Sequence, residues 1–281
     1  MNFVTFYSTV KKYRAVFMDS YGVLKNYQGL IEGVQDTINF IRDEGIALRV
    51  LTNDASKSQA QQAEVFEEMG LKGLKEEEII TSGMLARQFL ELKITEGKIA
   101  YLGTENSADY ILESGLEHVA VSDIDLNDVS EISAFVFMDD EGFDWNEDID
   151  KTVNLLRRTN IPVVVANSDK YYPVSMDDVS VATGSVADLV EDILTQNFIH
   201  FGKPDSQMFM YAFEDLNESG DYEKNEILMV GDTLGTDIMG GNKFGLKTML
   251  VLSGNTRAQK AQLQINSTGI IPDFIGESIL I

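Results

Sequence analysis

An apolar run that ends on a carboxylate marks the first chemically informative stretch of the chain. Val16, Phe17 and Met18 are followed by Asp19 and then by a turn that contains Gly22. Such a run predicts a strand, and the carboxyl ends of strands are where open α/β sheets gather ligands and catalytic groups. A carboxylate at this place can attack phosphorus and form an aspartyl-phosphate. A strand-end aspartate that only caps a turn is the alternative.

Polar residues in three later segments add to this candidate nucleophile. They are Thr52-Asn53 after an apolar run, Lys203 between Gly202 and Pro204, and the loop Gly231-Asp232-Thr233-Leu234-Gly235-Thr236-Asp237. Mg²⁺ prefers oxygen ligands and usually takes one or two carboxylates together with waters and substrate phosphate. Asp19 with Asp232 meets this need, and Asp237 is placed to support them. A helix N-cap is the alternative role for Asp232.

In this order, the four motifs resemble those of the haloacid dehalogenase-like (HAD) phosphohydrolase superfamily. The resemblance implies that Asp19 is the nucleophile and a Mg²⁺ ligand, and that the backbone carbonyl of Tyr21 is a second ligand. It implies that Lys203 neutralises the nucleophile and the phosphate. It also implies substrate contacts, which we expect from Thr52 and Asn53 through phosphoryl oxygens and from the turn of Ser20, Tyr21 and Gly22. Asp232 and Asp237 complete the expected metal site.

The resemblance narrows to the subclass that includes the nucleotide monophosphatase NagD and pyridoxal phosphatase. It covers essentially the whole chain and rests on Gly29-Leu30-Ile31-Glu32-Gly33 and on Leu51-Thr52-Asn53-Asp54-Ala55-Ser56-Lys57. Family members carry Thr-Asn-Asn-x-Ser at the second point, so Asp54 departs from the pattern. Further on, Asn167 and Asp169 resemble the Asn-x-Asp element with which the subclass faces its active site. An ordinary polar loop is the alternative there.

One departure concerns the reaction itself, because Tyr21 stands where the family has a second aspartate. In family phosphatases that aspartate protonates the leaving oxygen and then activates water, and such help is worth about 10²–10⁴-fold. Tyrosine, with a reference pKa of about 10, does not act as a carboxylate base at neutral pH. Positioning and electrostatic stabilisation remain, and they dominate phosphoryl transfer. We therefore expect slow turnover that depends on the leaving group.

Two functions of different class follow from these residues. The first is a Mg²⁺-dependent phosphatase that acts on a small phosphorylated metabolite, such as a sugar phosphate, through an aspartyl-phosphate. The alternative is a catalytically impaired protein that binds a phosphorylated ligand and keeps the Mg²⁺ and phosphate site. The sequence does not separate the two, nor does it name the substrate.

The elements around these residues predict an α/β protein. The strand at Asp19, a helical pattern over residues 34–41 and a strand ending at Thr52 fit within roughly 33 residues, the length of one βαβ crossover. Apolar runs at residues 99–102, 134–138 and 162–166 alternate with helical patterns farther along, and Ser185 is expected to be a helix N-cap.

The spacing of the motifs predicts how the chain is divided. Thr52 and Lys203 are about 150 residues apart, far beyond a single loop or crossover. We therefore expect a Rossmann-like, doubly wound parallel-sheet core that contains an inserted α/β cap domain. The core would be discontinuous, over residues 1–80 and 197–281, and the cap would take residues 81–196.

The amino-acid composition argues against several kinds of binding partner and location. The chain has 281 residues, of which 46 are acidic and 22 basic, so its formal net charge is −24. This charge, without a basic stripe, argues against nucleic-acid binding. No apolar run approaches the length of a membrane span. The absence of cysteine excludes disulfides, and a start without signal-peptide features predicts a cytoplasmic location. His118 and His200 are expected to be structural, and a homodimer is left open.

Overall fold

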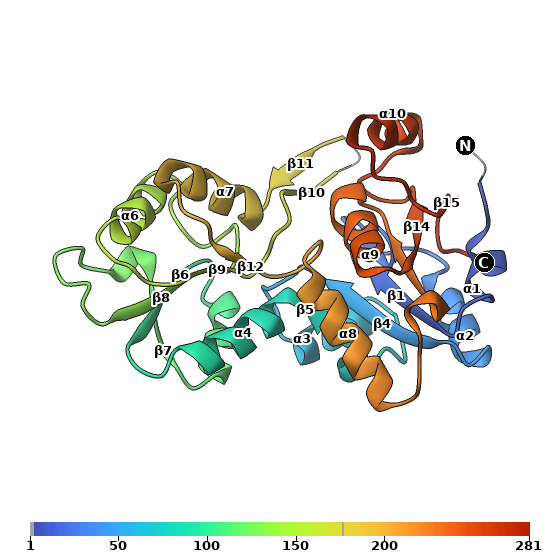
Figure 1. The fold of residues 1–281 in the computed structure, drawn as a ribbon, viewed down its shortest axis with the longest axis horizontal. Coiled ribbons are helices and arrows are strands. Elements are labelled where there is room, and N and C mark those ends of the chain that lie inside the picture. Colours follow the sequence, from blue (N-terminus) through green and yellow to red (C-terminus); the bar gives the residue numbers. More distant parts are fainter. Residues whose placement is uncertain (1–2, 176) are drawn as a thin grey trace.

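The structure of the protein, a computed structural model, describes residues 3–175 and 177–281. In this part of the chain the longer strands form two sheets whose neighbouring strands are parallel, and four short strands form two antiparallel pairs. Figure 1 shows the two large sheets in two lobes that lie side by side. None of the helices in these described ranges has the length and apolarity that crossing a membrane requires.

The six-stranded sheet is built from segments near both ends of the described chain. Its order is β15 (Phe274–Gly276), β14 (Lys247–Val251), β13 (Ile227–Gly231), β1 (Ala15–Asp19), β4 (Ala47–Thr52) and β5 (Ile79–Thr81). The inner strand β1 is buried along its whole length. A strand of a parallel sheet that is covered on both faces reads as a continuous apolar run, which explains residues 15–18.

Helices cover both faces of this sheet. Val16 and Met18 share a buried cluster with residues of α1 (Phe6–Val10), α2 (Val34–Asp43) and α3 (Gln59–Glu68). Phe17, which points the other way, shares a cluster with residues of α8 (Ser206–Glu218) and α9 (Met239–Phe244). The helix α10 (Ala258–Thr268) contributes Ile265 to a small cluster beside β14. This arrangement is the predicted doubly wound core.

The five-stranded sheet has the order β12 (Ile199–His200), β9 (Val163–Val165), β8 (Ile132–Phe137), β6 (Lys98–Leu102) and β7 (Glu117–Ala120). Phe135 and Phe137 pack in a cluster with residues of α6 (Glu147–Leu156) and α7 (Thr183–Leu194). On the other face, Val136 belongs to the cluster that contains residues of α4 (Ser82–Lys93) and α5 (Asp109–Glu113). That same cluster includes Phe17 of the first sheet, so apolar packing is continuous between the two sheets.

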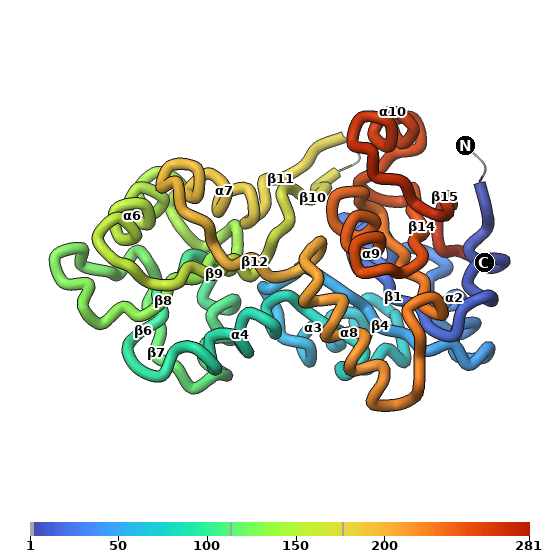
Figure 2. The backbone as a smooth tube through the Cα atoms, in the orientation of Figure 1, coloured from blue at the N-terminus to red at the C-terminus, as the bar shows by residue number. Residues whose placement is uncertain are grey.

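Shorter elements connect these parts. The two antiparallel pairs are β2 (Lys25–Asn26) with β3 (Gly29–Leu30), and β10 (Tyr171–Pro173) with β11 (Val179–Val181). Short 3₁₀ helices lie at Glu76–Glu78, Asn106–Ala108, Val121–Asp123 and Lys224–Glu226, and a π-helical turn lies at Leu234–Ile238. Figure 2 follows the backbone out of the first lobe through α4 and back into it between β12 and α8.

The predicted fold class is confirmed, because parallel sheets flanked by helices make up both lobes. Four strands of the second sheet lie within residues 81–196, but β12 follows them at residues 199–200, where it pairs with Val164 and Val165. The division into core and cap domains stays a prediction. The N-cap predicted at Ser185 is wrong: α7 begins at Thr183, and the Ser185 hydroxyl instead donates to the carbonyl of Lys170 at 2.7 Å.

Candidate active site

Three neighbouring strands bring the predicted motifs to one edge of the first sheet. Asp19 is the last residue of β1, Thr52 is the last residue of β4, and Asp232 directly follows β13. The strands are parallel, and Asp19 lies in register with Leu51 of β4. Carboxyl ends of parallel strands lie at a common edge, so these side chains meet although they are far apart in the sequence.

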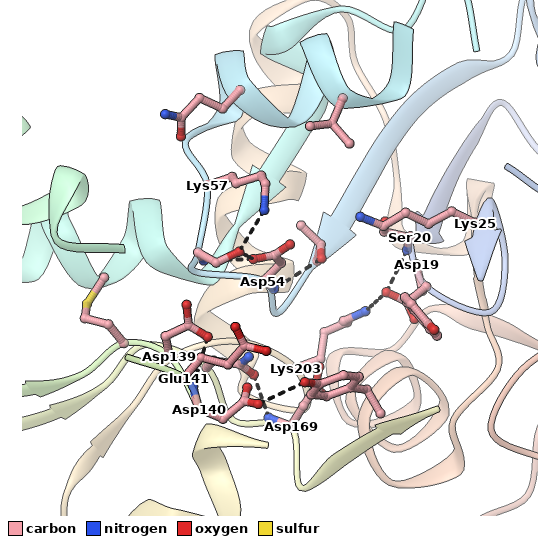
Figure 3. Close-up of a pocket in the computed structure, with 18 of the residues that line it drawn as sticks. Asp19, Ser20, Lys25, Asp54, Lys57, Asp139, Asp140, Glu141, Asp169 and Lys203 are labelled. Carbon is pink, nitrogen blue, oxygen red and sulfur yellow. Dashed lines mark hydrogen bonds and ion pairs between the residues drawn. The ribbon is translucent and has the colours of Figure 1, made fainter. Parts of the chain in front are cut away.

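Lys203 lies at the centre of the buried charges. Its ammonium contacts Asp19 Oδ1 at 2.5 Å and Asp237 Oδ1 at 2.9 Å, and it donates to the carbonyl of Leu51 at 2.9 Å. The side chain is only 2% exposed, and Figure 3 shows it pointing toward Asp19. Burial by itself would lower the pKa of Lys203, but the surrounding carboxylates raise that pKa above its ordinary value. Lys203 is therefore a permanent cation.

The position of Lys203 is set by Asn53. The backbone amide of Lys203 donates to Asn53 Oδ1 at 2.7 Å, and Asn53 Nδ2 donates to the carbonyl of Lys203 at 2.9 Å. Asn53 Nδ2 also donates to Asp169 Oδ1 at 2.9 Å. The amide group predicted to bind phosphoryl oxygens thus makes three contacts to Lys203 and Asp169.

Asp19, Asp232 and Asp237 gather their carboxylates in one place, with one oxygen from each lying within 4.8 Å of the others. Burial raises the pKa of Asp19 well above its ordinary value, against the opposing effect of Lys203. Burial and the neighbouring Asp237 raise the pKa of Asp232 to about 7. Buried carboxylates that face one another are the donor set that a hard divalent cation binds, because its charge removes their repulsion.

The loops hold Asp232 and Asp237 tightly. Asp232 Oδ2 accepts from the Asn255 amide at 2.5 Å, and Asp237 Oδ2 accepts from the Thr233 amide at 3.0 Å. Gly22 and Gly254 pack directly against Asp232, since a Cβ on either would lie 2.1 or 1.9 Å from Asp232 Oδ2. The Gly22 backbone also has a φ of +81°, a conformation that side-chain-bearing residues rarely adopt.

A cavity of about 630 Å³ opens at this edge of the sheet. Seven of the predicted site residues line it, namely Asp19, Ser20, Tyr21, Thr52, Asn167, Asp169 and Lys203. The other four are buried next to it: Asp232 and Asp237 against Asp19, Asn53 against Lys203, and Gly22 against Asp232. The structure therefore brings all of the predicted residues together.

Tyr21 points toward the second lobe. Its hydroxyl donates to the carbonyl of Pro173, in β10, at 2.5 Å. Burial raises the pKa of the Tyr21 hydroxyl, so it stays protonated at neutral pH. The hydroxyl proton is thus used in a contact with a segment 152 residues away along the chain.

The cavity also contains charged residues that were not among the predicted site residues, and Figure 3 shows them on two sides of it: Lys25, Asp54 and Lys57 from one lobe, and Asp139, Asp140 and Glu141 from the other. Asp140 Oδ2 accepts from the Tyr172 hydroxyl at 3.0 Å. Asp139 directly follows the apolar run that ends at Met138, so the strand-end pattern that identified Asp19 also applied to it.

Lys25 and Asp54 carry opposite charges in the same cavity, and each affects the pKa of the other. Burial lowers the pKa of Lys25. Burial alone would raise the pKa of Asp54, but the charge of Lys25 and hydrogen bonds from Ser56 and Gln62 bring it below the ordinary value. Asp54, the residue that departs from the family pattern, is therefore an anion that stabilises Lys25 as a cation.

Comparisons with known proteins agree with this geometry. Residues 16–117 match the family model described as haloacid dehalogenase-like hydrolase, and residues 200–277 match one described as HAD-hydrolase-like. Bovine (Bos taurus) chronophin is 26% identical over 96% of this chain and 92% of its own length. Phosphoglycolate phosphatase 1A of Arabidopsis thaliana is 27% identical over 93% of this chain and 74% of its own length.

A solved structure is more similar. The protein from Cytophaga hutchinsonii described as a possible sugar phosphatase of the HAD superfamily is 48% identical, with a TM-score of 0.96. The match covers 100% of this chain and 99% of that one. The chain thus belongs to the haloacid dehalogenase-like hydrolase superfamily and is a phosphohydrolase, as its four motifs predicted.

Proposed function

We propose that the protein is a Mg²⁺-dependent phosphomonoesterase that acts on a small phosphorylated metabolite through an aspartyl-phosphate at Asp19. The observation that carries the proposal is the buried pair of Asp19 and Lys203, placed beside two further carboxylates at the wall of a cavity. Such a group of charges in a cleft has no structural need and is costly to bury, which is typical of an active site.

Asp19, Asp232 and the backbone carbonyl of Tyr21 would hold the cation, with Asp237 behind them. The structure supports this assignment through the short distances between the three carboxylates and through the raised pKa of Asp232. The close packing of Gly22 and Gly254 against Asp232 fixes the direction of its carboxylate. When bound, Mg²⁺ would neutralise phosphoryl charge in a cavity whose own charges are mostly negative.

The hydrogen bonds of Asp19 indicate which oxygen reacts. Oδ1 accepts from the Ser20 amide at 2.7 Å and contacts Lys203, which leaves Oδ2 to attack phosphorus. The P–O bond of the ester breaks as the Oδ2–P bond forms, and the electron pair goes to the leaving oxygen. Water then attacks the acyl phosphate, which releases inorganic phosphate and restores the carboxylate. Lys203 stabilises negative charge in both steps without transferring a proton.

Turnover is expected to be slow, because the hydroxyl of Tyr21 is used in its bond to Pro173. An alkoxide that leaves without a proton donor is a poor leaving group. This same observation favours a second candidate function, a protein that binds a phosphorylated ligand without useful hydrolysis.

The size and polarity of the cavity favour a small, hydroxyl-rich leaving group. A volume of about 630 Å³ is in the range of metabolite pockets. Its walls carry carboxylates that accept hydrogen bonds, among them Asp140 and Asp169. The relatives described as a possible sugar phosphatase and a phosphoglycolate phosphatase point to the same class of small phosphate ester.

Phosphate release from a panel of sugar, glycerol, glycolate and aryl phosphates, with Mg²⁺ and with EDTA, tests the proposal. We expect Mg²⁺-dependent release that is lost in Asp19→Asn, which keeps the shape of the side chain but cannot form the acyl phosphate. Asp36→Asn, on the exposed surface of α2, is the matched control. Release at the wild-type rate by Asp19→Asn would refute the mechanism. Tight binding of a panel member without release would favour the second candidate.

A further inference from the structure

The β10–β11 hairpin extends from the second lobe to the first, and its described residues make two polar contacts with that lobe. Tyr21, in the turn after β1, donates its hydroxyl to the carbonyl of Pro173 at 2.5 Å. Arg257, just before α10, pairs with Asp177 at 3.1 Å. Figure 1 shows the hairpin reaching from the side of α7 toward α10. The hairpin therefore bridges the two lobes.

The side chain of Tyr21 also stands between two cavities. The first is the cavity of about 630 Å³ with Asp19 and Lys203 in its wall. The second, of about 280 Å³, lies under the hairpin and is lined by Pro173, Tyr27 and Arg257 among others. Tyr21, Tyr171 and Asn255 line both, so Tyr21 forms part of the wall that separates them.

We propose that Tyr21 is a clasp that holds the β10–β11 hairpin against the loop that follows the nucleophile. By this contact it closes the wall of the substrate cavity on the side of the leaving group. Tyr21 is thus a positioning residue, which acts on substrate binding through the hairpin and not on the reacting atoms. The role in substrate binding rests on the proposed phosphatase function; the contact itself does not.

The chemistry of the two residue types at position 21 explains why tyrosine serves here and aspartate would not. A phenol is protonated at neutral pH and donates to a main-chain carbonyl, whereas an ionised aspartate has no proton to donate. An aspartate at position 21 is also too short to reach the hairpin, because its carboxylate ends well before the place that the tyrosine hydroxyl occupies. With tyrosine in place of the family's aspartate, the side chain at position 21 no longer donates a proton to the substrate. It donates a hydrogen bond to the hairpin instead.

Tyr21→Phe removes the hydroxyl and keeps the ring and the backbone carbonyl. Without the hydrogen bond we expect faster hydrogen–deuterium exchange of hairpin amides in residues 171–175 and 177–181. On an aryl phosphate, whose leaving group needs little proton donation, we expect KM to rise about 3- to 10-fold, the loss that one hydrogen bond causes. The value of kcat should change less than twofold.

Tyr27→Phe is the matched control, because Tyr27 lines the second cavity and lies outside the groups that bind or react with phosphate. It should leave both readouts at wild-type values. Arg257→Gln cuts the other contact of the hairpin and should also speed its exchange, and the double variant with Tyr21→Phe should exceed either single one.

Unchanged exchange in Tyr21→Phe would overturn the clasp. A large fall in kcat at constant KM would overturn it too, because the hydroxyl would then act on the reacting atoms. If the protein releases no phosphate from any ester, the proposed function fails, while the exchange experiment on the protein without substrate still decides whether the clasp exists.

Discussion

At the scale of single residues, the candidate site is governed by charges that are buried together. Asp19 and Lys203 are each costly to bury alone, but at 2.5 Å they stabilise each other's charged form. Asp232 and Asp237 add negative charge next to this pair, and burial together with the charge of Asp237 raises the pKa of Asp232. The site is left with an excess of negative charge, which the proposed Mg²⁺ would offset. Tyr21 contributes no charge, and its hydroxyl faces Pro173.

Tyr21→Asp tests whether a missing proton donor limits the reaction. A restored carboxylic acid protonates an alkoxide, which otherwise leaves poorly, whereas a nitrophenolate needs little help. We expect kcat on an alkyl phosphate to rise on the order of 10²-fold, with little change on an aryl phosphate. Tyr21→Phe, which loses the same contact to Pro173 without gaining an acid, is the control. Equal gains on both substrates would mean that proton donation does not limit turnover.

The stability of Asp54→Asn as a function of pH tests the electrostatic interaction between Asp54 and Lys25. The pKa of Asp54 is lowered in the folded protein, from an ordinary value of 3.8, so its ionised form stabilises the fold above that value. This contribution is lost as pH falls through the lower native pKa. We expect Asp54→Asn to destabilise the protein by about 1–2 kcal/mol at pH 7 and by less near pH 3. Urea unfolding of the wild-type and Asp54→Asn proteins between pH 3 and pH 7 measures the difference in their stability. This difference would stay constant if Asp54 did not ionise in that range.

At the scale of elements, the turns after the strands decide how the carboxylates point. After β13, the π-helical turn Leu234–Ile238 brings Asp237 back so that it accepts from the amide of Thr233. Asp205 caps α8 through the amide of Gln207, so that this helix begins at Ser206, three residues after Lys203. Glycines let the loops after β1 and β14 approach Asp232 closely. The strands bring these residues to one edge of the sheet, and the turns determine how their side chains are oriented.

Gly254→Ala tests the packing of these loops around the proposed metal site. Its Cβ would lie 1.9 Å from Asp232 Oδ2, so the carboxylate or the loop must move. We expect Mg²⁺ affinity, measured by calorimetry, to fall at least about tenfold, as for other residues that orient metal ligands. Gly235→Ala is the control in the neighbouring turn, since among the described residues no atom outside its chain neighbours and its own helical backbone lies within 4 Å of its Cβ. Equal affinities in the two variants would contradict the role of Gly254.

At the scale of the whole molecule, two sheets share a site that neither contains alone. The first sheet supplies Asp19 and Thr52, and segments that follow strands of the second sheet supply Asp139, Asp140 and Asp169. Asn53 of one lobe and Asp169 of the other are hydrogen-bonded at 2.9 Å. Movement of one lobe against the other would therefore change the cavity directly.

We predict that residues 81–196 move as a lid over the residues of the first sheet when a phosphoryl group binds, which excludes water from the cavity. Small-angle X-ray scattering with Mg²⁺ and orthovanadate, a phosphate analogue, should give a smaller radius of gyration than without them. The Asp19→Asn protein, measured under the same conditions, shows whether the change needs the nucleophile. An unchanged radius in wild type, with vanadate bound, would contradict lid closure.

Local pattern in the sequence determined a large part of this protein. The run before Asp19 and the loop around Asp232 could be predicted as strand ends because an apolar run and the turn that follows it are patterns of a few neighbouring residues. The distance between Thr52 and Lys203 required an inserted unit, since a chain of that length does not form a single loop. The four motifs then indicated the family and the candidate site.

Tertiary structure alone decided what depends on residues far apart in the chain. The hydroxyl of Tyr21 meets Pro173 across 152 residues, and β12 joins the second sheet by pairing with β9. The amide of Asn53 is used to hold Lys203, 150 residues away. No local pattern encodes these contacts. Each depends on how distant segments of the chain pack and on which hydrogen-bond partner a buried polar group meets there. The sequence showed that position 21 lacks an acid; only the folded chain shows what the tyrosine does instead.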